Sequence, residues 1–155
     1  MDLSEFCKGE VVTITQGQTI LEAAVLMRER SVGCLIITHS DGSGVPVGVL
    51  TDRDIVSRGV AQMLPVDSMP VSSIMSVSPV TVAATEDVRE VIKLMEHHRV
   101  RRIIIVDASG APIGIVSTDD LLKVLANDLN LLGELIQVQT GTRSRHRTHE
   151  FTRMA

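Results

Sequence analysis

Two short stretches of the chain each combine a glycine, a hydroxyl residue and a carboxylate at the same spacing. The residues are Gly48, Thr51 and Asp54 in the first stretch, and Gly114, Ser117 and Asp120 in the second. Three positions from hydroxyl to acid is the spacing of a capping box, in which each side chain accepts a hydrogen bond from the other residue's main chain. Capping at a helix start therefore explains both stretches without any ligand, because a duplicated segment carries its cap with it.

The same groups could also hold a phosphorylated sugar. A helix N-terminus presents unpaired amides and the positive end of its dipole, which favour phosphate. The hydroxyl can donate to a phosphate oxygen, and the carboxylate can accept from ribose hydroxyls, as the acidic residue of dinucleotide folds does. Glycine lets a ligand approach the main chain closely. No Ser-His-Asp or Cys-His arrangement stands out, so we predict binding and no enzymatic activity.

The elements around the first stretch follow a β-α-β-β-α order. A short β-branched strand is expected at 11–14, and Thr19 is a good N-cap for a helix from Ile20 to Arg30. An apolar run at 34–37 predicts a buried strand, and a second strand follows at 45–50. Thr51 then opens a helix to about Arg58.

The same order returns around the second stretch. We expect a strand at 80–82, a helix capped by Thr85 and running to about His98, and a buried strand at 103–106. A strand at 112–116 follows, and Ser117 opens a leucine-rich helix to about Gln137. The predicted fold class is therefore α/β (α+β), with two β-α-β-β-α repeats.

The repeats divide the chain into four parts. Repeat one is expected at 8–62, an ordered connector with a short helix near 72–75 at 63–75, repeat two with an extended C-terminal helix at 76–137, and a mobile basic tail at 138–155. A unit of about 50 residues is too small to bury a core alone, so the two repeats should pack face to face.

The doubled order and the doubled motif resemble a tandem pair of cystathionine-β-synthase (CBS) domains, free-standing rather than fused to an enzyme or transporter. The resemblance implies a compact pseudo-twofold disc with two clefts that hold adenosine compounds such as AMP, ADP, ATP or S-adenosylmethionine. It gives Asp54 and Asp120 the ribose and Thr51 and Ser117 the phosphate. The adenine would lie beside main chain at four positions: Thr13, Ile14, Thr81 and Val82.

The two repeats differ in charge where a phosphate would lie. Arg101 and Arg102 precede the buried strand of the second repeat, whereas Gly33 and Cys34 hold the matching place in the first. Basic residues at this place bind phosphate in the family that the chain resembles. Because adjacent strand residues face opposite ways, we expect only one of the two arginines to enter a cleft. We also expect at least one cleft to be weak or empty.

The composition argues against nucleic acid and membranes as binding partners. The net charge is −4, although Arg143, Arg145, Arg147 and Arg153 against Glu150 make the tail basic, at +3. An acidic body without Trp or Tyr argues against nucleic-acid binding, which we consider only for the tail. No apolar run approaches the ~18 residues of a membrane span, and the polar N-terminus does not indicate a signal peptide, so we expect no membrane contact and a cytoplasmic location.

A metal site is not expected. His97 and His98 are adjacent, so on a helix their side chains point about 100° apart, and no cysteine or well-placed carboxylate completes a ligand set. No cofactor is required by the sequence beyond an adenosine nucleotide as ligand. We therefore interpret His97 and His98 as solvated residues at a helix end rather than as metal ligands.

The functional prediction is a sensor that binds an adenosine nucleotide between the repeats and signals through a homodimer to a regulated protein that the sequence does not name. The leucine-rich last helix, with Leu131, Leu132 and Leu135, extends beyond the needs of one repeat and is expected to dock on a second copy. The alternative is a ligand-free structural module for dimerisation or protein docking, which contacts its partner through the basic tail.

Overall fold

The computed structural model describes residues 3–8 and 11–139. The chain divides into two units, residues 1–118 and residues 119–155. The first contains both repeats, and the second contains nearly all of the last helix. The expected basic tail lies almost wholly outside the described residues.

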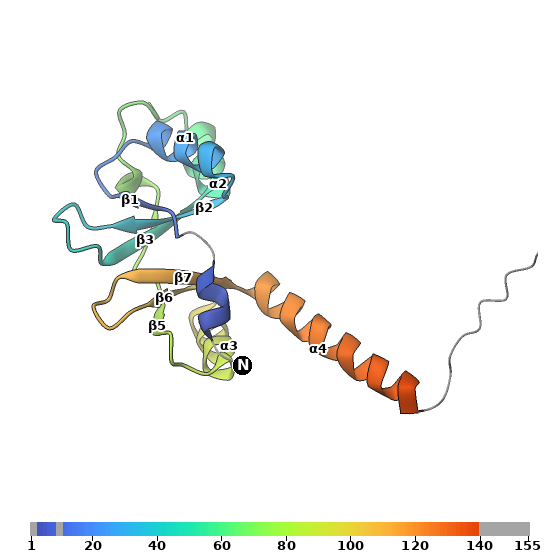
Figure 1. Ribbon diagram of the computed structural model, residues 1–155. Coiled ribbons are helices and arrows are strands. Elements are labelled where there is room, and N and C mark those ends of the chain that lie inside the picture. Colours follow the sequence, from blue (N-terminus) through green and yellow to red (C-terminus); the bar gives the residue numbers. More distant parts are fainter. Residues whose placement is uncertain (1–2, 9–10, 140–155) are drawn as a thin grey trace, which may run out of the picture. The chain divides into compact units, whose positions relative to one another are not determined.

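The first repeat forms a sheet with the order β1-β2-β3-β4 (Figure 1). Its elements are η1 (Leu3–Lys8), β1 (Thr13–Thr15), α1 (Ile20–Arg30), β2 (Cys34–Thr38), β3 (Pro46–Thr51), α2 (Asp52–Asp54), η2 (Ile55–Gly59), η3 (Val60–Gln62), η4 (Val71–Ser73) and β4 (Ser76–Val77). Strand β1 runs parallel to β2, and β2, β3 and β4 are antiparallel neighbours.

The second repeat forms a sheet with the order β5-β6-β7. Its elements are β5 (Thr81–Ala83), α3 (Val88–His98), β6 (Arg102–Val106) and β7 (Pro112–Ser117), followed by α4 (Thr118–Gln139). The registers repeat as well, since Thr13 pairs with Ile36 in the first sheet and Thr81 pairs with Ile104 in the second. The predicted fold class, α/β with two β-α-β-β-α repeats, is thus confirmed.

The buried strands are the two that the sequence predicts. Leu35, Ile36 and Ile37 of β2 are at most 2% exposed, and the matching run of β6 is equally buried. Helix α1 packs on β2 and α3 on β6. Each helix places residues at helical spacing against its sheet, such as Met27 and Met95. Apolar burial of this kind, at about 1.5–3 kcal/mol per large side chain, is the main source of stability.

The helix caps confirm one prediction and correct another. Thr19 caps α1 as predicted, and its hydroxyl accepts from the amide of Glu22 (3.1 Å). Helix α3 instead begins after Asp87, whose carboxylate accepts from the amide of Arg89 (2.7 Å), so the expected cap at Thr85 was wrong. Asp87 is the residue that matches Thr19 in the repeat, and a carboxylate caps as well as a hydroxyl.

The connector belongs to the fold more closely than its composition indicates. Val71 and Ile74 lie in the hydrophobic core of the first repeat, and β4 pairs with β3. At the start of the chain, η1 makes the corresponding contact with β7, and Leu3 is fully buried. Each repeat is therefore preceded by a segment that packs on the last strand of the other repeat. Segment η1 packs on β7, and β4 packs on β3.

The helix predicted at Thr51 is irregular. It consists of three α-helical residues, then a wider π turn over Ile55–Gly59 and a 3-10 turn over Val60–Gln62. Gly59 is buried within the π turn, where its nearest neighbours are side chains of Ile20, Val66 and Ile74. Such π turns inside helices are frequent at functional sites.

Candidate functional site

Thr51 and Asp54 form a complete capping box at the end of β3. The Asp54 carboxylate accepts from the amide (3.0 Å) and the hydroxyl (2.6 Å) of Thr51 through Oδ2, and the amide of Asp54 donates to Thr51 Oγ1 (3.2 Å). The second oxygen, Oδ1, lies 3.5 Å from Nε of Arg58. The capping prediction is therefore confirmed. Any ligand at Asp54 must use the carboxylate lone pairs that Thr51 leaves unoccupied.

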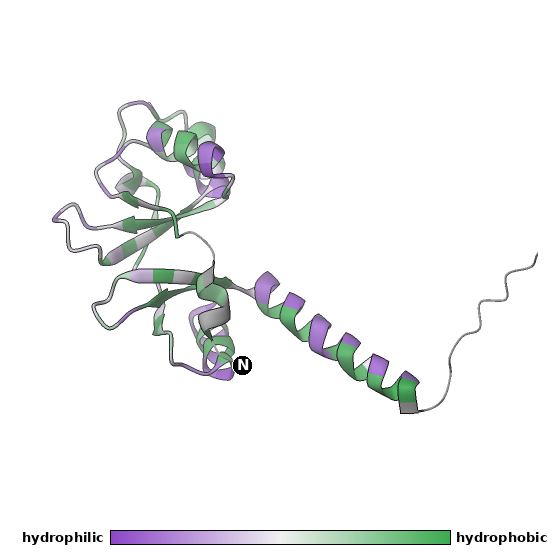
Figure 2. Ribbon diagram, viewed as in Figure 1, coloured by the Kyte–Doolittle hydropathy of each residue, from purple (hydrophilic) through white to green (hydrophobic). Residues whose placement is uncertain are grey.

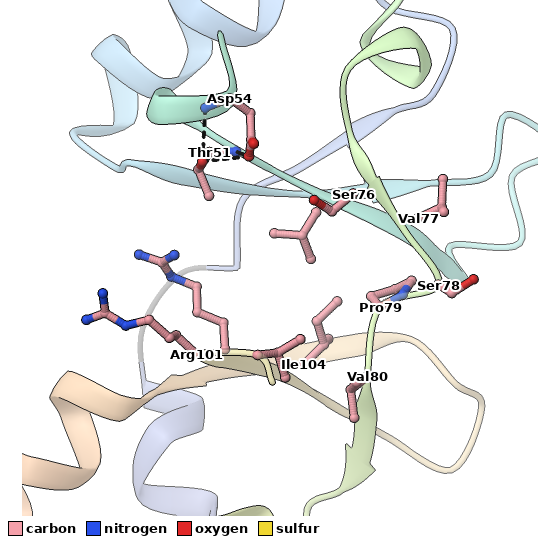
Figure 3. Close-up of a pocket in the computed structure, with 12 residues that line it drawn as sticks. Thr51, Asp54, Ser76, Val77, Ser78, Pro79, Val80, Arg101 and Ile104 are labelled. Carbon is pink, nitrogen blue, oxygen red and sulfur yellow. Dashed lines mark hydrogen bonds between the residues drawn. The ribbon is translucent and has the colours of Figure 1, made fainter. Parts of the chain in front are cut away.

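These two residues also line a cleft of about 190 Å³ between the repeats (Figure 3). The first repeat contributes the end of β3 and Asp54 of α2. The segment at 76–80, which includes β4, and the start of β6 complete the lining. The lining residues are Val49, Thr51, Asp54, Ser76, Val77, Ser78, Pro79, Val80, Val100, Arg101, Arg102 and Ile104.

Both arginines line this cleft, so the prediction that only one would enter was wrong. The strand β6 begins at Arg102, and Arg101 precedes it. The alternation of side chains across a sheet applies only within a strand, and it does not constrain Arg101. Figure 3 shows Thr51 and Asp54 on one side of the cleft and Arg101 on the other.

Cys34 lies within electrostatic reach of both Arg102 and Asp54. Cys34 pairs with Thr51 across β2 and β3. Burial raises the pKa of the Cys34 thiol; Arg102 acts in the opposite direction, and Asp54 and Asp52 act in the same direction as burial. The thiol therefore stays protonated near neutral pH and is a poor nucleophile, while Arg102 and Asp54 both act on it electrostatically.

Gly48 lies outside the cleft lining and supports the wall of the cleft through the segment that it contacts. Gly48 lies against the connector: a Cβ built on it would be 2.6 Å from Met75 Sδ and 3.0 Å from the carbonyl oxygen of Ser76. The connector then continues through Ser78 and Pro79 to β5. Sequence reasoning missed Ser76, Ser78 and Pro79 as candidate site residues. Their signal was present, since a run of Ser and Pro directly before a strand marks a loop that can follow a ligand.

The second motif differs from the first in its surroundings. Ser117 ends β7 and pairs with Arg102, while Asp120 lies in the first turn of α4, where Lys123 Nζ is 3.5 Å from its Oδ1. Where the second repeat has Arg101, the first has Gly33, and the Asp52 carboxylate would lie 3.1 Å from a Cβ built there. An anion at that place would meet a carboxylate instead of a guanidinium.

The four residues predicted to lie beside adenine, Thr13, Ile14, Thr81 and Val82, do not line this cleft. Thr13 and Ile14 lie on β1, and the side chain of Ile14 is in the core. Val82 is also a core residue, and Thr81 lines a second, uncharged hollow of about 470 Å³ with Val45, Val106 and others. Val80, directly before Thr81, is the residue that lines the cleft. A main-chain role for the four remains a prediction.

The described residues offer neither a metal cluster nor a membrane-spanning helix. No group of three or more His, Cys, Asp and Glu side chains there could hold a metal ion. His97 and His98 stack edge to face, with ring centroids 4.9 Å apart, at the end of α3. Within the same ranges, no helix is long and apolar enough to cross a membrane.

The fold and the cleft define a tandem pair of β-α-β-β repeats that share a charged hollow. The family model of the CBS domain matches the chain twice, at residues 3–60 and 71–127. The chain belongs to the CBS domain family, and it carries a tandem CBS pair, which is a regulatory module. CBS domains are generally regulatory rather than catalytic.

Individual relatives agree with this assignment. An uncharacterized protein of Methanopyrus kandleri is 35% identical over 80% of this chain, and the match spans 62% of that protein. A CBS domain protein of Pyrobaculum aerophilum complexed with AMP has a TM-score of 0.68 at 30% identity, over 81% of this chain and 99% of its own. Hypoxic response protein I with two coordinated zinc ions has a TM-score of 0.66 at 28% identity, over 79% and 98% of the two chains.

Proposed function

We propose that this CBS pair is a non-catalytic sensor that binds an adenosine nucleotide in the cleft between Thr51 and Arg102. The observation that carries the proposal is the convergence of Thr51 and Asp54 from the first repeat with Arg101 and Arg102 from the second. Two guanidinium groups suit a phosphate, because each can donate two parallel hydrogen bonds to it. The AMP complex of the Pyrobaculum protein supports the class of ligand.

The mechanism we propose is linkage. A nucleotide held by both repeats interacts with them only when they are correctly apposed, so it favours that arrangement over others. The change in population is then passed to a regulated protein through a homodimer. A single competent cleft is expected, because Arg101 and Arg102 line this one while Asp52 lies beside Gly33 at the matching place in the first repeat.

Titration calorimetry with AMP, ADP, ATP and S-adenosylmethionine tests the proposal. We expect heat from at least one of the four, with a stoichiometry near one per chain. Loss of that heat in Arg101→Ala/Arg102→Ala, with the fold retained, would assign it to this cleft. Silence from all four ligands with the folded protein would end the nucleotide proposal.

A matched pair of threonine substitutions separates capping from ligand binding. Thr19 and Thr51 each form a full capping box, but only Thr51 lines the cleft. Thr19→Ala and Thr51→Ala should each lower the free energy of unfolding by about 0.5–2 kcal/mol, the usual value of a cap. Only Thr51→Ala should weaken AMP binding in calorimetry. Equal affinities in the two variants would leave Thr51 with a capping role alone.

The second candidate function is a ligand-free module for dimerisation or docking. It is favoured by the geometry of Asp54, whose carboxylate already accepts hydrogen bonds from the amide and the hydroxyl of Thr51 without a ligand. Contact through the basic tail, or nucleic-acid binding by it, concerns residues outside the described ranges. This candidate predicts no ligand heat, and it predicts a dimer whose dissociation constant is unaffected by adenosine compounds.

A further inference from the structure

Helix α4, taken by itself, carries a continuous apolar seam. Its members follow one another at alternating steps of three and four residues, and each is 48–68% exposed: Leu122, Leu125, Leu129, Leu132 and Ile136. Figure 2 shows hydrophobic residues along one side of this helix and hydrophilic residues along the other. Alternating steps of three and four are the a and d positions of a coiled coil.

The residues beside the seam suit close packing of a second helix. Ala126 and Gly133 occupy the same flank one heptad apart, and a Cβ built on Gly133 would meet nothing within 4 Å. Small residues on one flank let two helix backbones approach. The charged residues Lys123, Asp128 and Glu134 all lie off the seam, so pairing would bury no charge at a core position.

The charge of α4 decides against a lipid surface. Asp119, Asp120, Asp128 and Glu134 outweigh the single Lys123 of this helix. Helices that lie on anionic membranes are rich in Lys and Arg on their polar face. A seam with two apolar residues in every seven is instead as wide as the contact surface of one partner helix. A second copy of the chain supplies an identical seam.

The available area fits a weak but specific pair. At 1.5 Å per residue, the 22 residues of α4 extend for roughly 33 Å. Covering about half the circumference of a helix some 10 Å across buries roughly 500 Å² per copy, or about 1,000 Å² in total, which is the lower limit of specific interfaces. An interface of this size belongs to the smaller specific associations.

The direction of pairing is inferred from the helix dipoles. Antiparallel helices oppose the two dipoles, whereas parallel helices align them. The antiparallel arrangement brings Asp128 near the Asp128 of the partner, but this side chain is exposed at the edge of the seam, where water screens the repulsion.

We propose that α4 pairs with the α4 of a second copy as a short antiparallel coiled coil. Leu125 of one copy packs on Leu129 of the partner, and Leu122 packs on Leu132 of the partner. This inference rests on the homodimer of the proposed function and names its surface. It is independent of whether the cleft binds a nucleotide.

Neighbouring leucines provide a matched test. Leu132 lies in the seam and Leu131 lies outside it, and their exposures are 56% and 60%. In sedimentation equilibrium of the full chain, Leu132→Glu should weaken the dimer about tenfold or more, because a carboxylate replaces a core contact. Leu131→Glu should leave the dissociation constant within about twofold, and circular dichroism should show equal helix content.

Each other outcome has a definite meaning. If the unchanged chain stays monomeric at high micromolar concentration, both the seam and the homodimer are overturned. If it dimerises and Leu132→Glu does so equally well, the seam is overturned and the homodimer stands on another surface. Flotation of the chain with anionic vesicles, lost only in Leu132→Glu, would assign the seam to lipid and overturn the pairing. AMP titration of the same variants reports on the cleft separately.

Single cysteines test the direction. In antiparallel pairing with Leu125 on the partner's Leu129, Ala126 lies near the Ala126 of the partner, whereas Leu132 lies far from its own counterpart. Under mild oxidation, Ala126→Cys should form a covalent dimer beyond the background of the unchanged chain, and Leu132→Cys should not. The reverse pattern, expected of parallel helices in register, or no cross-link in either variant, would overturn the antiparallel arrangement.

Discussion

Arg102→Ala is expected to weaken AMP binding by about 10- to 100-fold, the usual value of a lost hydrogen bond to a charged group. Arg102 lines the cleft at the start of β6, and its charge acts on Cys34, which pairs with Thr51. Arg58 contacts Asp54 more closely but does not line the cleft, so Arg102 is the better candidate for a ligand phosphate. Titration calorimetry gives the affinity, and thermal unfolding checks that the variant folds.

Two further variants identify the cause of such a loss. Arg89→Ala removes the same charge from α3, outside the cleft lining, and should change the affinity by less than about twofold, since exposed charges at a distance are screened by salt. Arg102→Lys keeps the charge but loses the paired hydrogen bonds, so an intermediate affinity is expected. Equal losses in Arg89→Ala and Arg102→Ala would indicate net charge rather than a phosphate contact.

The repeat, its buried strands and the first cap could be predicted from the sequence because they depend on local signals. Runs such as Leu35–Ile37 are apolar on both faces, and Thr19 has its acid three residues on. The π turn at Ile55–Gly59 could not, because no local sequence signal distinguishes it from an α-helical turn, and Gly59 there lies close to Ile20 and Ile74 from other elements. Asp87 was overlooked because Thr85 is also a good cap, and only the comparison with Thr19 selects between them.

The sequence predicts which residues could bind a ligand, but it does not predict which of them share one cleft. The sequence identifies Thr51, Asp54, Arg101 and Arg102, yet they lie on different repeats, and only packing brings them to one cleft. The order of charges along the chain does not show that Arg102 lies in the same cleft as Asp54, because the two residues belong to different repeats. The contacts of β4 with β3 and of η1 with β7 likewise join segments that are distant in the sequence.

Gly48→Val is expected to lower the free energy of unfolding by about 1–3 kcal/mol, the usual cost of overpacking, and to weaken AMP binding as well. A side chain at this position meets Met75 Sδ at 2.6 Å and the Ser76 carbonyl oxygen at 3.0 Å. The sulfur can move, but the carbonyl belongs to β4, which pairs with β3. Displacing β4 shifts the segment Ser76–Val80, which lines the cleft.

Gly114→Val is the matched control, because Gly114 holds the corresponding place on β7. A Cβ there would lie 3.1 Å from the carbonyl oxygen of Phe6 and 3.0 Å from Cys7 Sγ, so η1 must move. Denaturant titration should show a similar loss of stability in both variants. Below the unfolding transition, however, calorimetry should show weaker AMP binding only in Gly48→Val, since η1 contributes no residue to the cleft lining. Equal affinities in the two variants would mean that the connector wall does not position the ligand, and binding would then depend on the arginines and Thr51 alone.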